Sequence, residues 1–262
     1  MGRGQTGLTV RGLDNLVIMF DDLETGIARY RELGFTVIPG GSHGGVTHVA
    51  LVAFADRTYL QLMAFERAAP THRWWDAKQR GGGFIAFCLH TTTLAEDLAA
   101  LRRAGAPLRD PVRGGRVRPD GYELAWTTAW TEGPFLPETP VLIEDHTPRE
   151  QRVPIEYHHE NGVRGIEAIA VATDDVPRAR GWWSALLGQP GAAIERPEHD
   201  AAGVRFEVGP HAIEFLAPRG PGGPVASLID RRGPSPYAVT LAGPGGPRQL
   251  DERRTGTLMR IA

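Results

Sequence analysis

The chain has 262 residues, of which 41% are hydrophobic and 23% are charged. This is the composition of a globular protein with enough apolar surface for one large domain or two small ones. A net charge of −2 favours neither nucleic acid nor an anionic membrane as a partner. No apolar run has the length of a signal peptide or of a membrane span, so we expect a cytoplasmic protein.

The single cysteine, Cys88, excludes an internal disulfide framework. It lies in the apolar run of residues 84–89, and we interpret it as a small buried hydrophobic residue rather than a nucleophile.

The first repeating unit begins with a β-prone run at residues 13–20. Asp21, followed by Glu24 three residues later, is typical of a capped helix start, and Gly34 can end that helix after one stripe of apolar residues. Strands are expected next at residues 35–38, 47–54 and 58–65, with a glycine-rich turn after the first of them. The predicted order is one strand, one helix and three strands.

The same order returns twice along the chain. A strand is expected at residues 84–89, and Thr93 with Glu96 predicts a helix that ends at Gly105. Strands are then expected near residues 121–131 and 139–144. The third copy has strands at residues 166–171, 204–208 and 212–216, and a helix that begins after Asp174 and Asp175 and ends at Gly188. Three units with matching caps indicate an internal repeat.

The tail offers strands at residues 237–241 and 257–261 but only a short helical stretch. We interpret it as an abbreviated fourth unit. The predicted domains are residues 8–147 with two units, a linker at 148–165, and a second module at 166–262. The fold class is α+β, with repeated β-α-β-β-β units that form cupped mixed sheets.

These units resemble the vicinal oxygen chelate superfamily, and most closely its glyoxalase-like branch. The resemblance rests on residues 13–18, 23–34, 47–62 and 118–121, and on Asn161 and Gly162. It implies the fold shared by glyoxalases, bleomycin-resistance proteins and extradiol dioxygenases. It implies no single chemistry, because this scaffold carries many functions.

The resemblance also implies where a divalent metal would bind. Superfamily members that hold Zn²⁺, Ni²⁺, Mn²⁺ or Fe²⁺ take a histidine from the first strand and a glutamate from the last strand of each unit. The first unit here has Asn15 and Gln61 at these positions, and the second has Ala86 and Glu144. Neutral amides bind such ions weakly, so no metal cofactor is favoured. If an ion does bind, the expected ligands are His48, Gln61 and Glu144.

Asn15 and Gln61 are the first candidates for ligand binding. Strand alternation separates them from Leu16 and Leu60, so the amides face the cup if the helix covers the leucines. There they can hydrogen-bond a ligand. The alternative is that they are a buried amide pair that satisfies itself or the backbone.

Two histidines are candidates for a general base. His48 is the second residue of the strand predicted at 47–54. His146 follows Glu144 and Asp145 at the end of another predicted strand. Imidazole titrates near neutral pH, so either residue can accept a proton. The alternatives are a structural hydrogen bond for His48 and local charge pairing for Glu144 and His146.

Arg118 and Trp126 complete the predicted ligand site. Arg113, Arg116 and Arg118 alternate through a glycine-rich segment, from which an arginine can clamp a carboxylate or phosphate. Trp126 can stack on an aromatic ligand. The alternatives are a solvated loop for the arginines and simple packing for the tryptophan.

The sequence therefore predicts a protein that binds a small polar or aromatic molecule in the cup of its N-terminal domain. The metal site of the superfamily is expected to be eroded. The alternative is a metal-dependent lyase, isomerase or dioxygenase with relocated ligands. A structural or interaction role would be favoured if side chains filled the cup. The second module is expected to cover the first and could support a homodimer.

Overall fold

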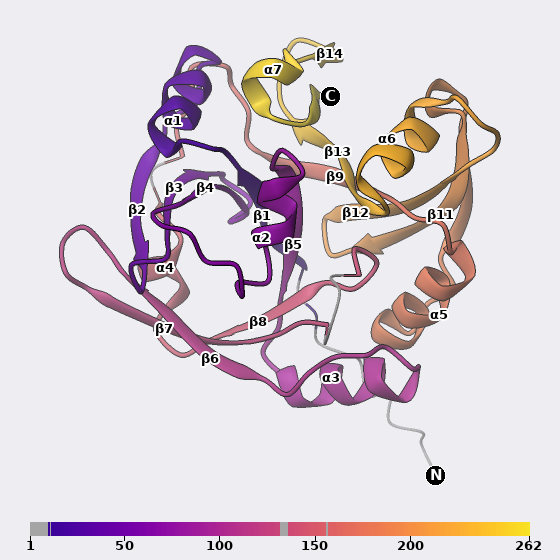
Figure 1. Ribbon diagram of the computed structural model, residues 1–262, viewed down its shortest axis with the longest axis horizontal. Coiled ribbons are helices and arrows are strands. Elements are labelled where there is room, and N and C mark those ends of the chain that lie inside the picture. The colour runs from indigo at the N-terminus through magenta and orange to yellow at the C-terminus, as the bar shows by residue number, and fades with distance from the viewer. Residues whose placement is uncertain (1–9, 11, 132–135, 156) are drawn as a thin grey trace.

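The computed structural model describes residue 10 and residues 12–131, 136–155 and 157–262. Two β-sheets organise this part of the chain (Figure 1). Strands β1 to β8 close into a barrel, and strands β9 to β15 form an open seven-stranded sheet beside it.

The barrel contains the first two predicted units. The first unit comprises β1 (Gly12–Met19), α1 (Leu23–Glu32), β2 (Ile38–His43), β3 (Thr47–Ala53) and β4 (Tyr59–Phe65). The short helix α2 (Trp75–Gln79) leads to the second unit, which comprises β5 (Gly83–His90), α3 (Leu94–Arg103), β6 (Val112–Val117), β7 (Glu123–Ala129) and β8 (Val141–Asp145). Around the barrel the strand order is β1-β4-β3-β2-β6-β7-β8-β5. β1 pairs in parallel with β4 and antiparallel with β5, so the two units meet along their first strands.

The open sheet contains the third unit and the tail. The third unit comprises β9 (Gly165–Ala172), α5 (Val176–Leu187), β10 (Ala192–Arg196), a 3-10 turn (Pro197–His199), β11 (Ala201–Val208) and β12 (His211–Pro218). The tail comprises α6 (Pro224–Arg232), β13 (Ser235–Ala242), β14 (Arg248–Gln249), α7 (Glu252–Thr255) and β15 (Leu258–Ile261). The α+β class and the repeated β-α-β-β-β unit are confirmed.

Several element boundaries differ from the sequence-based predictions. The glycine-rich segment after Ile38 is strand β2 rather than a turn, and residues 112–117 form strand β6 rather than a loop. Both segments gain ladder hydrogen bonds from neighbouring strands, which outweighs the low strand propensity of glycine. Helix α1 is capped by Asp22 instead of Asp21, because the Asp22 carboxylate accepts the Thr25 amide at 2.8 Å. The tail has two short helices, α6 and α7, where the sequence predicted one short helical stretch, and the proline in the first turn of α6 made its start resemble a loop.

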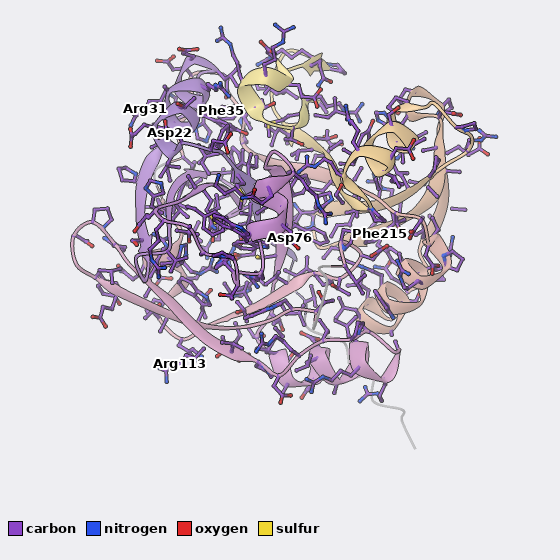
Figure 2. All side chains as sticks on the ribbon, viewed as in Figure 1. Asp22, Arg31, Phe35, Asp76, Arg113 and Phe215 are labelled. Carbon is purple, nitrogen blue, oxygen red and sulfur yellow. The ribbon has the colours of Figure 1, made fainter. Side chains whose placement is uncertain are left out.

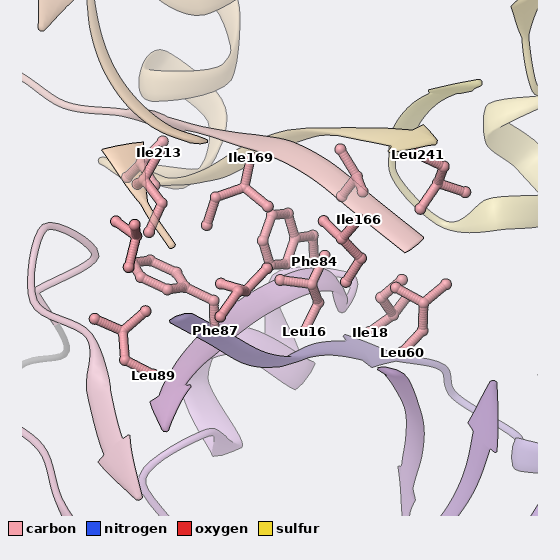
Figure 3. Packing of buried hydrophobic residues seen from close by; sticks show 14 of the residues in the cluster. Leu16, Ile18, Leu60, Phe84, Phe87, Leu89, Ile166, Ile169, Ile213 and Leu241 are labelled. Carbon is pink, nitrogen blue, oxygen red and sulfur yellow. The ribbon is translucent and has the colours of Figure 1, made fainter. Parts of the chain in front are cut away.

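A single apolar core joins the two sheets. Figure 3 shows Leu16, Phe84 and Phe87, from the outer face of the barrel, packed against Ile166 and Ile169 on β9. Because strand side chains alternate, the opposite faces of β1, β4 and β5 are turned into the barrel. The outer faces therefore hold the molecule together, while the inner faces are available for a site.

The segment predicted as a linker is packed onto the barrel. Its helix α4 (Arg149–Arg152) ends in a fully buried arginine. Farther on, the buried His159 ring accepts a hydrogen bond from the Thr36 amide at 3.0 Å and lies 2.9 Å from the Ala53 carbonyl oxygen. The barrel wall therefore continues into this segment. No helix within the described ranges is long and apolar enough to cross a membrane.

Candidate ligand cavity in the barrel

The interior of the barrel contains a cavity of about 650 Å³. Its wall combines aromatic rings, arginines and a few neutral polar groups. The volume is in the range of pockets that bind a small organic molecule.

The two predicted amides lie in this wall. Asn15 and Val17 reach the cavity from β1, and Tyr59 and Gln61 reach it from β4. Both amide residues are buried, at 2% and 8% exposure for Asn15 and Gln61, and no hydrogen bond to either side chain is found among the described residues. The two amides are therefore available to a ligand, rather than bonded to each other.

The second unit presents a different wall. Its first strand contributes Cys88, which lies directly across the ladder from Asn15, and its last strand contributes Val141 and Ile143. Burial raises the pKa of the Cys88 thiol to about 12, so it is a neutral thiol at neutral pH. Alternation turns Glu144 away from the cavity, and its carboxylate accepts the Leu94 amide at the start of α3 at 3.3 Å.

His48 lies outside the cavity, contrary to the site predicted from the sequence. Thr47 from the same strand lines the cavity, whereas His48 shares the outer face of β3 with Ala50 and Val52 of the core. Strand alternation is the physical reason, because two neighbouring residues cannot face the same side.

His146 and Arg118 also lie away from the cavity wall. The His146 ring is 2.7 Å from the Thr127 hydroxyl, in a separate surface depression that it shares with Glu144. Arg118 donates to the Gln151 side chain at 3.0 Å and pairs with Asp120.

Trp126 lines the cavity, and so do Arg113 and Arg116, whereas Arg118 does not. Figure 2 labels Arg113 on β6 at the lower edge of the barrel. The ligand set expected for a metal is not assembled, because Gln61 faces the cavity and His48 and Glu144 do not. Among the described residues, no cluster of three or more His, Cys, Asp or Glu could hold a metal ion.

Arginines give the cavity its charge. Five of them line it, and none of the described residues lining the cavity is Asp or Glu. The five are Arg73, Arg109, Arg113, Arg116 and Arg152. The cavity is therefore strongly electropositive.

Two of these arginines are bonded within the barrel. Arg152 donates to both carboxylate oxygens of Asp14 at 2.9 Å, to Asp145 at 2.9 Å and to the Tyr59 hydroxyl at 2.8 Å. Burial acts to raise the pKa of Asp14, but Arg152 and Arg149 outweigh it and hold that pKa below its usual value. Asp14 is therefore a carboxylate within the barrel wall.

Arg116 donates to the carbonyl of Gly40 and, at 2.8 Å, to that of Arg152. This arginine ties β6 to β2 and to α4. Burial lowers its pKa to about 10, which leaves it charged at neutral pH.

Arg73 is bound differently. Its guanidinium lies over the rings of Trp74 and Trp130, at 4.1 and 4.3 Å from the ring centres. Its Nη1 atom is buried without a hydrogen-bond partner in the described structure, and so is the indole Nε1 of Trp74. Burial lowers the pKa of Arg73 to about 10, so the guanidinium remains charged.

Two histidines, His43 and His72, also line the cavity, and both are neutral at neutral pH. Burial, with the neighbouring arginines, lowers the pKa of each to about 4. No sequence pattern points to His72 or Arg73, because they lie in an irregular segment without periodicity. His43 is the last residue of strand β2.

Two β-α-β-β-β units closed around an internal cavity, with further copies of the unit beside them, define a protein of the vicinal oxygen chelate class. Residues 13–187 match the glyoxalase-like domain, and the chain belongs to that family. No curated protein matches the chain.

Solved structures share the fold at low sequence identity. A hypothetical protein from Staphylococcus aureus has a TM-score of 0.69 at 15% identity, over 95% of this chain and 98% of that one. A mutant of 4-hydroxymandelate synthase from Streptomyces coelicolor has a TM-score of 0.64 at 13% identity, over 90% and 72%. A xylose isomerase-like TIM barrel/4-hydroxyphenylpyruvate dioxygenase fusion protein has a TM-score of 0.56 at 16% identity, over 91% and 37%. Identities this low support the fold alone.

Proposed function

We propose that the protein binds a small polar or aromatic molecule in the barrel cavity and does so without a divalent metal ion. The observation that carries this proposal is the wall itself, in which unpartnered amides and aromatic rings surround about 650 Å³ of space. Tyr59, Trp74, Trp126 and Trp130 supply flat apolar surfaces, and Asn15 and Gln61 supply both donors and acceptors.

The donors at the inherited metal positions do not fit a divalent transition metal. The first unit offers the amides of Asn15 and Gln61. In the second unit Ala86 and Glu144 do not line the cavity, and the lining residues of the same strands include Cys88 and the apolar Ile143. Zn²⁺, Ni²⁺ and Fe²⁺ need imidazole, carboxylate or thiolate ligands. The arginines around these positions repel a cation further.

The test combines metal content with ligand binding. Purified protein incubated with Zn²⁺, Ni²⁺, Mn²⁺ or Fe²⁺ and then desalted should retain far less than one ion per chain by mass spectrometry. In the presence of EDTA, the protein should still bind members of a library of aromatic and polar fragments, measured as a rise in Tm. Gln61→Leu and Trp126→Ala should reduce these shifts, whereas His48→Gln, which changes the outer face of β3, should not.

Two results would contradict the proposal. One tightly held ion per chain that is needed for fragment binding would favour a metal-dependent enzyme. Fragment binding that is unaffected by Gln61→Leu and Trp126→Ala would place the site outside the barrel.

A further inference from the structure

The charges of the cavity wall restrict the kind of molecule that it can hold. Five guanidinium groups line the cavity, and no carboxylate lines it among the described residues, because Asp14 lies behind Arg152. His43 and His72 are neutral at physiological pH and leave this balance unchanged. A ligand that enters the cavity is therefore attracted if it is an anion and repelled if it is a cation.

Most of these arginines have other partners or are exposed to solvent. Arg152 is neutralised by Asp14 and Asp145, and Arg116 is bonded to backbone carbonyls. Arg109 and Arg113 are exposed, so water can solvate their guanidinium groups. These four arginines contribute to the electrostatic potential of the cavity. Each of them either has a hydrogen-bond acceptor or is exposed to water.

Arg73 is the exception. No hydrogen bond or ion pair to its side chain is found among the described residues, and its Nη1 atom is buried. The rings of Trp74 and Trp130 contact the guanidinium through cation–π interactions, which leave the buried Nη1 group without an acceptor. The neighbouring indole N–H of Trp74 is a second buried donor without an acceptor.

Guanidinium and indole groups only donate hydrogen bonds. The group that satisfies them must therefore accept hydrogen bonds, and an oxyanion also neutralises the charge of Arg73. The tryptophans beside Arg73 supply flat surfaces for the rest of the ligand. This combination fits an aromatic acid better than an aliphatic or a neutral molecule.

We infer that the ligand is an aromatic organic acid whose carboxylate or phosphate group is held by Arg73 and the Trp74 indole N–H. This assignment rests on the proposed function and adds the charge of the ligand and its orientation. The acidic group lies at the α2 side of the cavity, and the ring extends toward Trp126 and the amides of Asn15 and Gln61.

The test compares aromatic acids with their own primary amides. The pairs run from benzoate and benzamide to 2-naphthoate and 2-naphthamide, with 2-naphthyl phosphate as the phosphate counterpart. Dissociation constants are measured by calorimetry in EDTA at low ionic strength. Wild-type protein should bind at least one acid about tenfold more tightly than its amide, because a charge-assisted hydrogen bond is lost in the amide. Relative affinities of naphthoate and naphthyl phosphate show which oxyanion the site prefers.

Three variants locate the acidic group. Arg73→Gln should remove the preference for the acid over the amide, and Trp74→Phe, which keeps a ring but lacks the N–H, should reduce it. Arg118→Gln is the matched control, because it removes an arginine that lies outside the cavity wall. That variant should keep the full preference. Equal Tm values in the absence of ligand establish that each variant is folded.

The outcomes separate this inference from the proposed function. Equal binding of acids and amides by the wild-type protein would overturn the inference and leave the proposed function standing. A preference for acids that survives Arg73→Gln would also overturn it, because another group would then hold the oxyanion. Binding of neither acids nor amides, nor of any fragment in the larger library, would overturn both.

Discussion

Asp14 and Arg152 form the most deeply buried ion pair of the barrel. Both side chains are almost inaccessible to solvent, and they are joined by two hydrogen bonds of 2.9 Å. The carboxylate comes from β1 and the guanidinium from the end of α4, so the pair fixes α4 on the barrel. Asp14 lies at a register irregularity of β1, between Leu13 and Asn15. A bulge of this kind redirects side chains, which simple alternation along the sequence cannot anticipate.

Removing one member of this pair should be costly. Arg152→Met leaves the buried Asp14 carboxylate with Arg149 alone as its ion-pair partner among the described residues, and we expect the free energy of unfolding to fall by about 3 kcal/mol. Urea unfolding followed by circular dichroism measures this change. Arg118→Met, which breaks an exposed pair with Asp120, should cost less than about 1 kcal/mol. Similar losses in the two variants would contradict a structural role for the buried pair, and adding Asp14→Asn to Arg152→Met should recover part of the loss.

His43 and His72 should make stability sensitive to acid. In the folded protein their pKa values are lowered to about 4, mainly by burial, whereas in the unfolded chain they are near 6.5. Between about pH 6.5 and pH 4 the unfolded state therefore binds more protons, and stability falls as the pH falls.

The double variant His43→Asn/His72→Asn tests this dependence. Its Tm should fall less than that of the wild-type protein between pH 7 and pH 5, and the two Tm curves should be parallel above pH 7. Parallel curves over the whole range would show that these histidines do not couple folding to protonation.

At this scale the sequence predicted only part of the site. Asn15, Gln61 and Trp126 line the cavity, and they could be proposed from the sequence because each lies on a strand whose alternation can be read. His48 was predicted to face the cavity, whereas it lies on the outer face of β3. Alternation shows which residues share a strand face, but not which of the two faces is turned toward the core. Arg73 was missed because its position is set by contacts with Trp74 and Trp130, which lie far apart in sequence.

At the scale of elements, the barrel closes through one narrow contact. β2 and β6 come from different units and are joined in register only by Ser42 and Val117. Gly41, beside Ser42, has a φ of +103° and lies so close to the Val117 carbonyl that an added Cβ atom would overlap it. Glycine is therefore required at this position for both conformation and space. The same glycines that made this segment resemble a turn allow the two strands to meet.

Gly41→Ala should weaken the closure of the barrel. We expect a lower Tm and weaker fragment binding, because β2 must move away from β6 and widen the cavity. Gly181→Ala is the matched control: Gly181 lies within α5 with open space around its Cα, so alanine there should leave binding unchanged and raise stability by up to about 1 kcal/mol. Full fragment binding by Gly41→Ala would show that the cavity does not depend on this contact.

Elements with local signals were predicted well. Helix α5 begins at Asp175, whose carboxylate accepts the Arg178 amide, and ends at Gly188 in the left-handed conformation, as the sequence indicates. Strands β2, β6 and β10 were missed or shifted, because their residues are held in the sheet by neighbours rather than by their own propensity.

At the scale of the whole molecule, the barrel and the open sheet share one core. Trp183 from α5 is fully buried, with ring centres of Phe87 at 6.1 Å and Phe215 at 5.2 Å. Phe87 belongs to the barrel, whereas Phe215 belongs to the open sheet. The Trp183 indole also donates to the Glu138 carbonyl at 2.7 Å, which connects α5 to the segment before β8. The repeat in the sequence predicted two modules, but it does not encode how tightly they pack.

A shared core predicts that the two sheets unfold together. Tryptophan fluorescence reports on the tryptophans of the barrel and on Trp182 and Trp183 of α5. In urea, this signal and far-ultraviolet circular dichroism should give one coincident transition. Phe87→Ala should shift that transition as a whole and lower the free energy of unfolding by about 3–5 kcal/mol, because it removes a buried ring between the sheets. Phe65→Ala, at the partly buried end of β4, should cost less. Two separated transitions, or a Phe87→Ala variant in which only one of them moves, would show that each sheet has a core of its own. In that case the cavity could form without the second module, whereas a single transition means that the second module supports the barrel wall around the cavity.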